Sequence, residues 1–165
     1  MNPPARSAQQ RKQDTLNRLE HDVDAWVATA DATGTPYLLP LSFRWDGSTL
    51  LFSTPAASRT GRNLRPGGTV RVSLGHTRDV VLIEGSVELI AAAEISTEIG
   101  DAFAAKAGFD PRDDTSPYTY FHVRPRRSPS TADVQISHAP SRIRSRPASS
   151  FTSRQACSRR GRTWK

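Results

Sequence analysis

The stretch from residue 51 to residue 64 carries the side chains of this sequence that are best suited to binding an anion. An apolar run ends in the hydroxyl pair Ser53 and Thr54, and Pro55 then interrupts it. A short helix is predicted to begin near Ser58, a residue type that commonly caps helices, and its first turns carry two arginines. Hydroxyls, backbone N–H groups and guanidinium groups gathered at the start of a helix are suited to a phosphate. The segment therefore predicts a phosphate site.

The length and composition limit the classes of protein to consider. The 165 residues are enough for one domain of ordinary size. No run approaches the roughly 18 apolar residues of a transmembrane helix, and the N-terminus lacks the charged-then-apolar pattern of a secretory signal. The single cysteine, Cys157, excludes an internal disulfide and a cysteine-cluster zinc site, and no other residues show metal-ligand spacing. We expect a cytoplasmic protein with no membrane contact and no metal centre.

The net charge of +7 originates in the C-terminal part of the chain. Residues 124–165 hold 11 Lys or Arg and one acidic residue, whereas residues 1–123 hold 12 basic and 15 acidic residues, a net charge of −3. A nucleic-acid-binding surface should be a basic patch on a folded face, with aromatic residues interleaved. The basic segment contains only two aromatic residues, Phe151 and Trp164. We therefore expect no specific nucleic-acid partner.

The pattern of apolar and turn-forming residues predicts six strands and three short helices. The strands are expected over residues 25–30, 37–44, 49–54, 70–74, 79–89 and 118–123, and the helices over residues 8–22, 58–64 and 91–108. The Asp46-Gly47 pair favours a two-residue hairpin between the second and third strands. Such strands, joined mostly by hairpins, predict a mainly β domain built as a small antiparallel barrel. An open sheet with a helix on one face is the alternative, but a barrel leaves no exposed edges.

The predicted domain spans residues 8–127. Residues 1–7 are expected to be a disordered lead-in, and residues 128–165 a disordered tail, because the tail holds nine serines and seven arginines without any periodicity. That composition cannot bury enough apolar area to offset the entropy of ordering. One hypothesis is that the tail results from a change of reading frame near codon 128 of a GC-rich gene, since such a change yields Arg, Ser, Pro and Ala.

A series of short motifs, in a fixed order, resembles a known family. In order along the chain they are Trp26-Val-Ala-Thr-Ala, Asp31-x-x-Gly34-x-Pro36, Leu39-Pro-Leu-Ser-Phe43, Asp46-Gly47, Leu51-Phe-Ser-Thr54, Ser58-Arg59-x-x-Arg62-Asn63-Leu64, Val70-Arg-Val-Ser73, Leu82-Ile-Glu-Gly85 and Tyr120-Phe-His-Val-Arg-Pro125. Residues 17–127 thus resemble the flavin-binding split barrels, the superfamily of pyridoxamine 5′-phosphate oxidase. The nearest branch is the short actinobacterial-type proteins, many of which use FMN or the deazaflavin coenzyme F-420.

The resemblance implies a six-stranded split β-barrel that forms a homodimer with two cofactors at the subunit interface. The cofactor is FMN, with coenzyme F-420 as the alternative. The strand over residues 40–44 would lie along the ring system, and the segment after the third strand would hold the phosphate. The cofactor-binding residues that the resemblance implies are Pro40, Ser42, Phe43, Arg44, Ser53, Thr54, Ser58, Arg59, Thr60, Arg62 and Asn63.

The function that the resemblance implies is an oxidoreductase that acts on an unknown small molecule. In flavin chemistry the ring carries the hydride and the protein supplies binding and orientation, so no catalytic side chain is assigned. A non-catalytic flavin-binding carrier or sensor is the alternative, and a polyanion-binding protein that works through its tail is a third option. The chain departs from the family after Arg127, where a Trp-bearing extension of the last strand is replaced by the tail.

Overall fold

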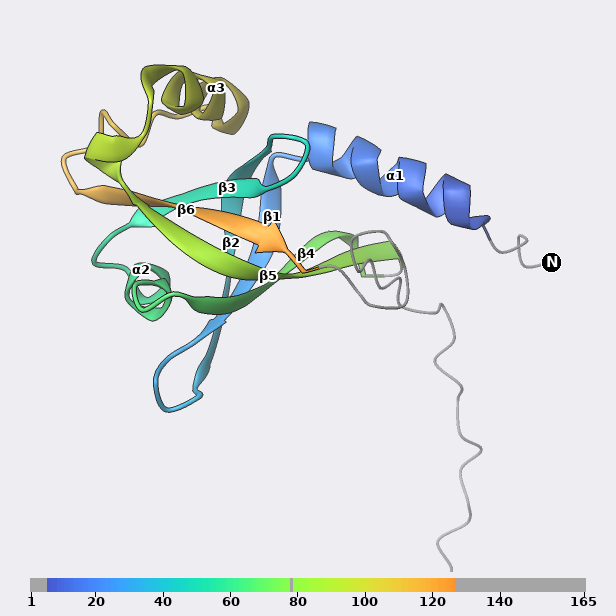
Figure 1. Ribbon diagram of the computed structural model, residues 1–165, viewed down its shortest axis with the longest axis horizontal. Coiled ribbons are helices and arrows are strands. Elements are labelled where there is room, and N and C mark those ends of the chain that lie inside the picture. Colours follow the sequence, from blue (N-terminus) through green and yellow to red (C-terminus); the bar gives the residue numbers. More distant parts are fainter. Residues whose placement is uncertain (1–5, 78, 127–165) are drawn as a thin grey trace, which may run out of the picture.

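Six strands and three α-helices make up the part of the chain that the computed structural model describes, residues 6–77 and 79–126 (Figure 1). The elements are α1 (Ala8–His21), β1 (Asp24–Ala30), β2 (Pro36–Trp45), β3 (Leu50–Pro55), α2 (Arg59–Leu64), β4 (Gly68–His76), β5 (Asp79–Ala91), a 3-10 turn η1 (Ala92–Glu94), α3 (Thr97–Ala107) and β6 (Tyr118–Pro125). The predicted order of strands and helices is confirmed. The third helix starts later than predicted, because β5 runs on to Ala91 and η1 follows it.

The strands form a closed barrel in the order β1-β2-β3-β6-β5-β4, and every neighbouring pair is antiparallel. The barrel closes where β4 pairs with β1, so the predicted barrel is confirmed and the open sheet is excluded. The ladders differ in length: β4 and β5 pair over nine residues, whereas β2 and β3 pair over three. Gly85 lies where β5 crosses β6 closely, since a Cβ atom there would stand 2.5 Å from a methyl group of Val123.

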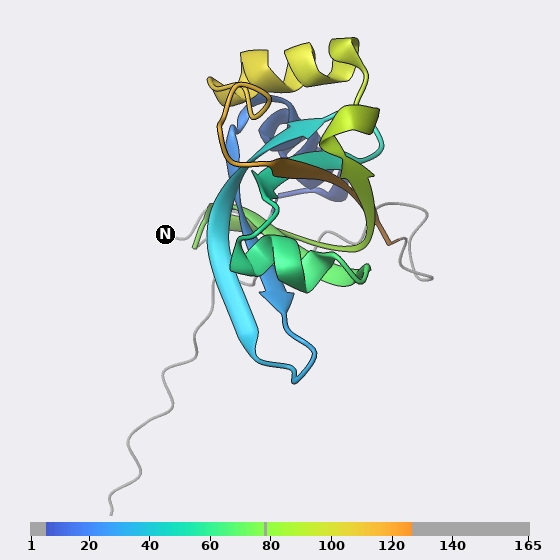
Figure 2. The ribbon, with the colours of Figure 1, turned by 90° about the vertical axis from the view of Figure 1, so that its left-hand side faces the viewer.

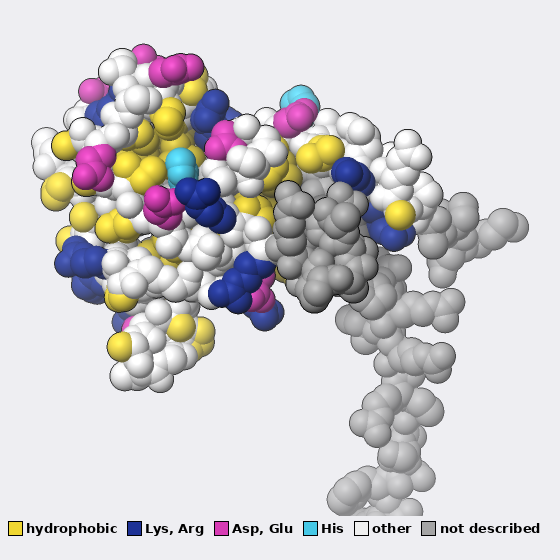
Figure 3. Space-filling model, in the orientation of Figure 1, with side chains coloured by type: hydrophobic (Ala, Val, Ile, Leu, Met, Phe, Trp, Pro, Cys, Tyr) yellow, Lys and Arg dark blue, Asp and Glu magenta, His cyan; other side chains and the backbone are white. Residues whose placement is uncertain are grey.

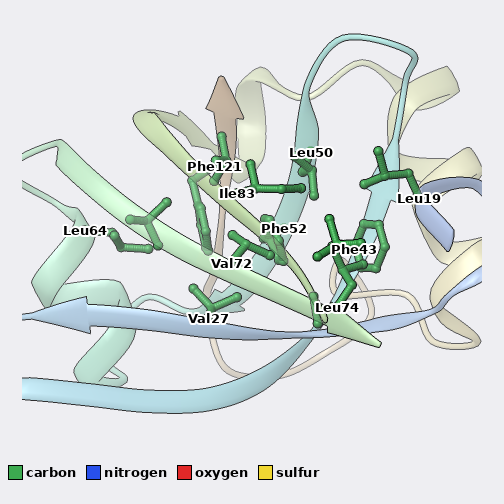
Figure 4. Packing of buried hydrophobic residues seen from close by; sticks show 14 residues of the cluster. Leu19, Val27, Phe43, Leu50, Phe52, Leu64, Val72, Leu74, Ile83 and Phe121 are labelled. Carbon is green, nitrogen blue, oxygen red and sulfur yellow. The ribbon is translucent and has the colours of Figure 1, made fainter. Parts of the chain in front are cut away.

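The barrel interior is filled by alternate residues of the strands, as a half-buried strand pattern requires (Figure 4). Phe52 lies between two other rings, 5.9 Å from Phe43 and 5.5 Å from Phe121 between centroids. Leu64 of α2 and Leu19 of α1 lie at opposite sides of this cluster, so each helix buries a leucine in the core. Fully burying a leucine side chain contributes roughly 2 kcal/mol to the free energy of folding. These two leucines therefore help to hold α1 and α2 against the barrel.

Helix α3 covers the outer side of the barrel over β3, β5 and β6 through a second cluster. Its Phe103 meets the ring of Tyr120 edge-on at 5.7 Å between centroids, and Leu51 of β3 completes the buried centre of the cluster. Ser96 caps the helix by accepting a hydrogen bond from the backbone N–H of Ile99. Gly108 ends it in the left-handed conformation at φ 77°, as the sequence predicts for a glycine after a helix.

Lys106 joins α3 to the C-terminal end of α1. Its ammonium group donates to the carbonyl oxygens of Leu19 and Glu20, both at 3.0 Å, and lies 4.7 Å from the ring centroid of Phe43. Partial burial lowers the pKa of Lys106, yet the carbonyl groups at the end of a helix favour a cation. This contact fixes α3 against the barrel beside β2.

The predicted lead-in and tail lie mostly outside the described residues. Of residues 1–7, only 6 and 7 are described, and Ser7 caps α1 by accepting a hydrogen bond from the N–H of Gln10. Arg6 donates to the carboxylates of Asp14 and Asp79, so it connects the start of α1 with β5. The predicted tail over 128–165, with the hypothesis of a changed reading frame, lies wholly outside the described residues.

The turn between β2 and β3 is longer than predicted. Trp45 pairs with Leu50, which leaves a four-residue loop in place of the expected two-residue hairpin. The Asp46 carboxylate stabilises this loop by accepting hydrogen bonds from the backbone N–H groups of Ser48 and Thr49, at 2.8 and 2.7 Å, and from both hydroxyls. Partial burial raises the pKa of Asp46, but the hydrogen bonds from Thr49 and Ser48 outweigh it and lower the pKa to about 2.

Replacing Asp46 by Asn should destabilise the fold in a pH-dependent way. The folded-state pKa of about 2 lies below the ordinary value of 3.8, so the carboxylate contributes stability above pH 3.8 and loses it as the pH falls through 2. After screening by solvent we expect Asp46→Asn to lower the free energy of unfolding by roughly 1 kcal/mol at neutral pH. Urea denaturation over a pH series measures this. Asp113→Asn, at an exposed aspartate, is the control, and a deficit that persists unchanged down to pH 2 would contradict the account.

Candidate functional site

The barrel opens between β2 and β3, which we call the fork. β2 pairs with β1 over residues 36–42 and with β3 only over its last three residues, ending at the pair Phe43 and Phe52. From that pair β3 continues along β6 to Pro55, whereas β2 stays with β1. Within the described part of the chain no strand pairs with residues 36–42 on the side that faces β3. Figure 2 shows β2 running from its hairpin with β1 past α2.

Helix α2 is fixed at the fork by tight contacts. The chain turns after Pro55, where the N–H of Ser58 donates to the Pro55 carbonyl at 2.9 Å. A Cβ atom at Gly61 would lie 2.7 Å from that same carbonyl oxygen, so only glycine lets the helix approach the turn this closely. Asn63 donates from its side-chain amide to the hydroxyl of Thr29 on β1 at 3.0 Å. The helix is therefore bonded to β1 and pressed against the end of β3.

The two hydroxyls that lead into α2 are bonded to the protein itself. Ser58 accepts a hydrogen bond from the N–H of Gly61 at 2.9 Å, which confirms it as the helix cap. Its oxygen also lies 3.0 Å from the hydroxyl oxygen of Thr54, a residue that is 1% exposed. These hydroxyls thus hold the turn in place, and Thr54 has little surface to offer a ligand.

Three other hydroxyls are buried and have no hydrogen-bond partner among the described residues: those of Ser53, Thr60 and Tyr120. A buried polar group without a partner costs roughly 1–3 kcal/mol, so each one calls for an explanation. Ser53 and Tyr120 are directly opposite each other in the ladder of β3 and β6. Burial raises the pKa of the Tyr120 phenol. Sequence reasoning did not select Tyr120 for the site, because a tyrosine in an apolar strand has the pattern of a core residue.

Arginines 44 and 59 differ from the other arginines of the described chain. Neither makes a hydrogen bond or an ion pair with a described residue; Arg59 is exposed, with its guanidinium carbon 5.1 Å from the ring centroid of Tyr37, and Arg44 is half-buried. Every other described arginine has at least one such bond, namely Arg6, Arg11, Arg18, Arg62, Arg65, Arg71, Arg112, Arg124 and Arg126. We call these two positively charged side chains, which lie toward opposite ends of β2, uncommitted, because neither has a hydrogen-bonded or ion-paired partner among the described residues.

The predicted β2 residues line the other side of the fork. Pro40 is exposed, and Ser42 donates to the carboxylate of Asp24 at 2.7 Å. The side chain of Phe43 is 0% exposed inside the core, and its N–H donates to the carbonyl of Val23, so this residue offers a ligand little beyond its carbonyl. Arg59 lies against Tyr37 near the start of β2, and Arg44 lies near its end. The predicted residues between Ser53 and Asn63 thus lie together at the end of β3 and in α2. The two uncommitted arginines lie toward opposite ends of β2.

Charges of both signs lie side by side on the face of the molecule seen in Figure 3. Ion pairs across β5 and β6 join Arg124 to Glu88 at 2.5 Å and Arg126 to Glu84 at 3.2 Å. Among residues 6–77 and 79–126, no three His, Cys, Asp or Glu residues are grouped so that they could hold a metal ion. None of the helices in those same ranges is both long enough and apolar enough to span a membrane.

The six antiparallel strands close into a barrel, and β2 and β3 are paired over only three residues before they separate. A barrel of this kind defines the class of split barrels. The sequence of residues 15–139 matches the family described as pyridoxamine 5′-phosphate oxidase. The chain belongs to this family, as the motifs indicated. The match extends beyond the described residues into the segment that was predicted to be a tail.

Solved structures share this fold at low sequence identity. An F-420 reductase is 21% identical with a TM-score of 0.57, and the match covers 67% of this chain and 92% of that one. HupZ of Group A Streptococcus is 20% identical with a TM-score of 0.51, over 74% and 91% of the two chains. HutZ, a heme storage protein of Vibrio cholerae, is 13% identical with a TM-score of 0.52, over 70% and 91%. No curated protein matches the chain. At these identities the likeness establishes the fold alone.

The two kinds of hydroxyl at α2 should respond differently to removal. We expect Ser58→Ala to lower the free energy of unfolding by about 1 kcal/mol, because the helix loses its cap and the bond to Thr54. Thr60→Val should not lower it and should raise it by up to about 1 kcal/mol, because valine keeps the shape and removes a buried hydroxyl that has no partner among the described residues. Urea denaturation of both variants measures the difference. Equal losses in the two variants would contradict this assignment.

Proposed function

We propose that this protein binds a phosphorylated flavin in the fork and acts as an oxidoreductase on a small molecule. FMN is the first candidate for the cofactor, and the deazaflavin coenzyme F-420 is the alternative. One observation carries the proposal: the two uncommitted arginines, Arg44 and Arg59, are both residues to which the family resemblance assigns cofactor binding. An arginine that has no hydrogen-bonded partner among the described residues can offer its donors to an external phosphate, which it would bind through charge-assisted hydrogen bonds.

The residues at the fork fit a phosphorylated ligand. Arg59 is exposed at the start of α2 and would supply positive charge to the phosphate, with Ser58 and Arg62 beside it. The side of β2 without a strand partner would face the ring system through its backbone, next to the exposed Pro40. The bound cofactor would supply the redox chemistry, while the protein would bind it, orient it and limit its contact with water.

A carrier or sensor of the same cofactor would use the same fork. Binding alone cannot separate it from an enzyme, because both functions require the same contacts with the phosphate and the ring. Turnover separates them: when an external reductant keeps regenerating the reduced cofactor, an oxidoreductase passes its electrons to a small-molecule acceptor many times per site. A carrier releases the reduced cofactor without using such an acceptor.

The absorbance spectrum of the purified full-length protein tests the proposed cofactor class. We expect two visible-range bands for bound FMN, or one for the deazaflavin, and release of the free cofactor after denaturation. Since one protein with this fold is a heme storage protein, the spectrum is also compared with that of heme. A protein that takes up neither flavin nor deazaflavin, or that binds heme in their place, would overturn the proposal.

We propose in addition that the protein forms a homodimer through an apolar area on the outside of the barrel, the outer patch. It consists of Trp26, Leu38, Pro40 and Leu82, of which Trp26 is 50% and Leu38 58% exposed. Trp26 pairs with Pro40 and Ser73, and Ser73 pairs with Leu82, so their side chains share one face of the sheet. Exposed apolar areas of this kind mark protein interfaces. Because Pro40 lies at the fork, a dimer through this patch would place the site beside the interface.

A charge at the centre of the outer patch should separate the subunits. We expect Trp26→Asp to shift the mass measured by light scattering from that of a dimer to that of a monomer, because the carboxylate would be buried without a partner. Leu89→Asp, at another exposed apolar residue of β5, should leave the dimer intact. Wild-type protein that is monomeric at all concentrations would falsify the proposed dimer.

A further inference from the structure

We infer that Tyr37 and Arg59 form one phosphate-recognition unit, in which Arg59 binds the phosphate of the cofactor and Tyr37 positions Arg59. The inference rests on the proposed function and names the pair of side chains that would carry its specificity. It assigns to Tyr37, a half-buried residue of β2, a role that the sequence motifs do not give it.

The hydrogen bonds within α2 single out Arg59 among the predicted phosphate ligands. Ser58 is occupied by the N–H of Gly61 and by Thr54, and the side chain of Asn63 by Thr29. A hydrogen bond from a side chain to a backbone group of its own turn must be given up, or shared, when a ligand arrives. The side-chain hydroxyl and amide groups of Ser58 and Asn63 therefore mainly hold the helix in place.

The remaining candidates are excluded by burial or by an existing bond. Ser53 is 4% exposed and Thr60 is 0% exposed, so neither hydroxyl reaches the surface of the chain. Arg62 is exposed, but its guanidinium donates to the carbonyl of Ala57. Arg59 is the exposed cation of this segment whose donors make no bond to a described residue.

Tyr37 holds the guanidinium of Arg59 without using its hydrogen-bond donors. The cation lies 5.1 Å from the ring centroid, a distance at which the face of a tyrosine ring attracts a guanidinium group. The N–H donors of arginine lie in the guanidinium plane, so stacking on a ring leaves its edge available for a phosphate. A ring contact of this kind orients the cation, whereas an ion pair with a carboxylate would compete with the ligand.

The backbone fixes the ring on the side that α2 occupies. Tyr37 pairs with Thr29 in the ladder of β1 and β2, so their side chains lie on the same face. Thr29 in turn accepts the hydrogen bond from Asn63 of α2. Two residues on one face of the hairpin of β1 and β2 thus contact α2. Thr29 bonds to Asn63, and Tyr37 contacts Arg59, the first residue of the helix. An arginine held in this way loses less rotamer freedom when it binds, and that preorganisation raises the affinity.

Titrations with phosphorylated and unphosphorylated ligands test the inference. Quenching of flavin fluorescence measures the affinity of the full-length protein for FMN and for riboflavin, and the same is done for coenzyme F-420 and its phosphate-free deazaflavin. We expect Arg59→Ala to weaken FMN or F-420 binding by about 10-fold or more and to leave the phosphate-free ligands nearly unchanged. Tyr37→Leu should weaken the phosphorylated ligand by about two- to fivefold, again selectively.

A double-mutant cycle measures whether the two residues act together. If they form one unit, Tyr37→Leu has no further effect once Arg59 is alanine, and the aromatic variant Tyr37→Phe keeps the wild-type affinity. Tyr118→Leu is the matched control, because this other half-buried tyrosine has its ring beside Phe109. Arg65→Ala is the second control, since Arg65 is already bonded to the carbonyl of Ala56. Thermal melts confirm that each variant is folded.

The outcomes separate this inference from the proposed function. Wild-type protein that binds neither phosphorylated ligand would overturn both. If wild type binds but Arg59→Ala keeps its preference for the phosphorylated form, the inference is wrong and the proposed cofactor class stands. If Arg59→Ala loses that preference but Tyr37→Leu keeps it, the assignment of Tyr37 is wrong. The assignment is also wrong if Tyr37→Leu weakens the binding of both forms equally, because Tyr37 then has only a structural role.

Discussion

The short ladder between β2 and β3 is the constraint on which the rest of the site depends. These strands share three residue pairs, whereas β3 pairs with β6 over six and β2 pairs with β1 over seven. The last shared pair, Phe43 and Phe52, is fully buried, and Phe52 stacks on Phe121 of β6. Because core packing holds the strands together at this pair and different partners draw them apart beyond it, the barrel must open there. Helix α2 and its arginines are placed by that opening.

The stability of the fork and the ligand binding that we propose for it would draw on the same polar groups. The cap by Ser58 and the amide of Asn63 hold α2 in position, and each uses a polar group that a phosphate would otherwise meet, while the close fit of Gly61 adds to the hold by shape alone. A helix of six residues has little intrinsic stability, so these bonds are needed. The donors of Arg59 are not used in this way, because its guanidinium group contacts an aromatic ring and not a hydrogen-bond acceptor of the described chain. The structural role and the proposed binding role thus fall to different side chains.

Local patterns in the sequence predicted most of the fold. The alternation of Ala25, Val27 and Thr29 specifies a strand with one buried face, and Ser58 and Gly108 mark helix ends through their own backbone chemistry. Features that depend on distant residues could not be predicted in the same way. The number of pairs between β2 and β3 and the approach of Arg59 to Tyr37 follow from long-range register. The loop at Asp46 was predicted wrongly, because its four hydrogen bonds outweigh the hairpin preference of the Asp-Gly pair. The eleven predicted cofactor residues remain a prediction.

The distribution of charge along the chain bears on the anion site that we propose. The excess of basic residues lies after residue 123, and the described part of the chain ends at residue 126. Within the barrel, arginines such as Arg112 and Arg124 are paired with acidic side chains, so their charge is largely cancelled at short range. Near α2, Arg59, Arg62 and Arg65 have no acidic partner among the described residues, because the bonds of Arg62 and Arg65 go to backbone carbonyls. In the proposed site the charge of these side chains would matter more than the total charge of the chain, because arginines elsewhere in the described residues, such as Arg112, Arg124 and Arg126, are paired with acidic groups.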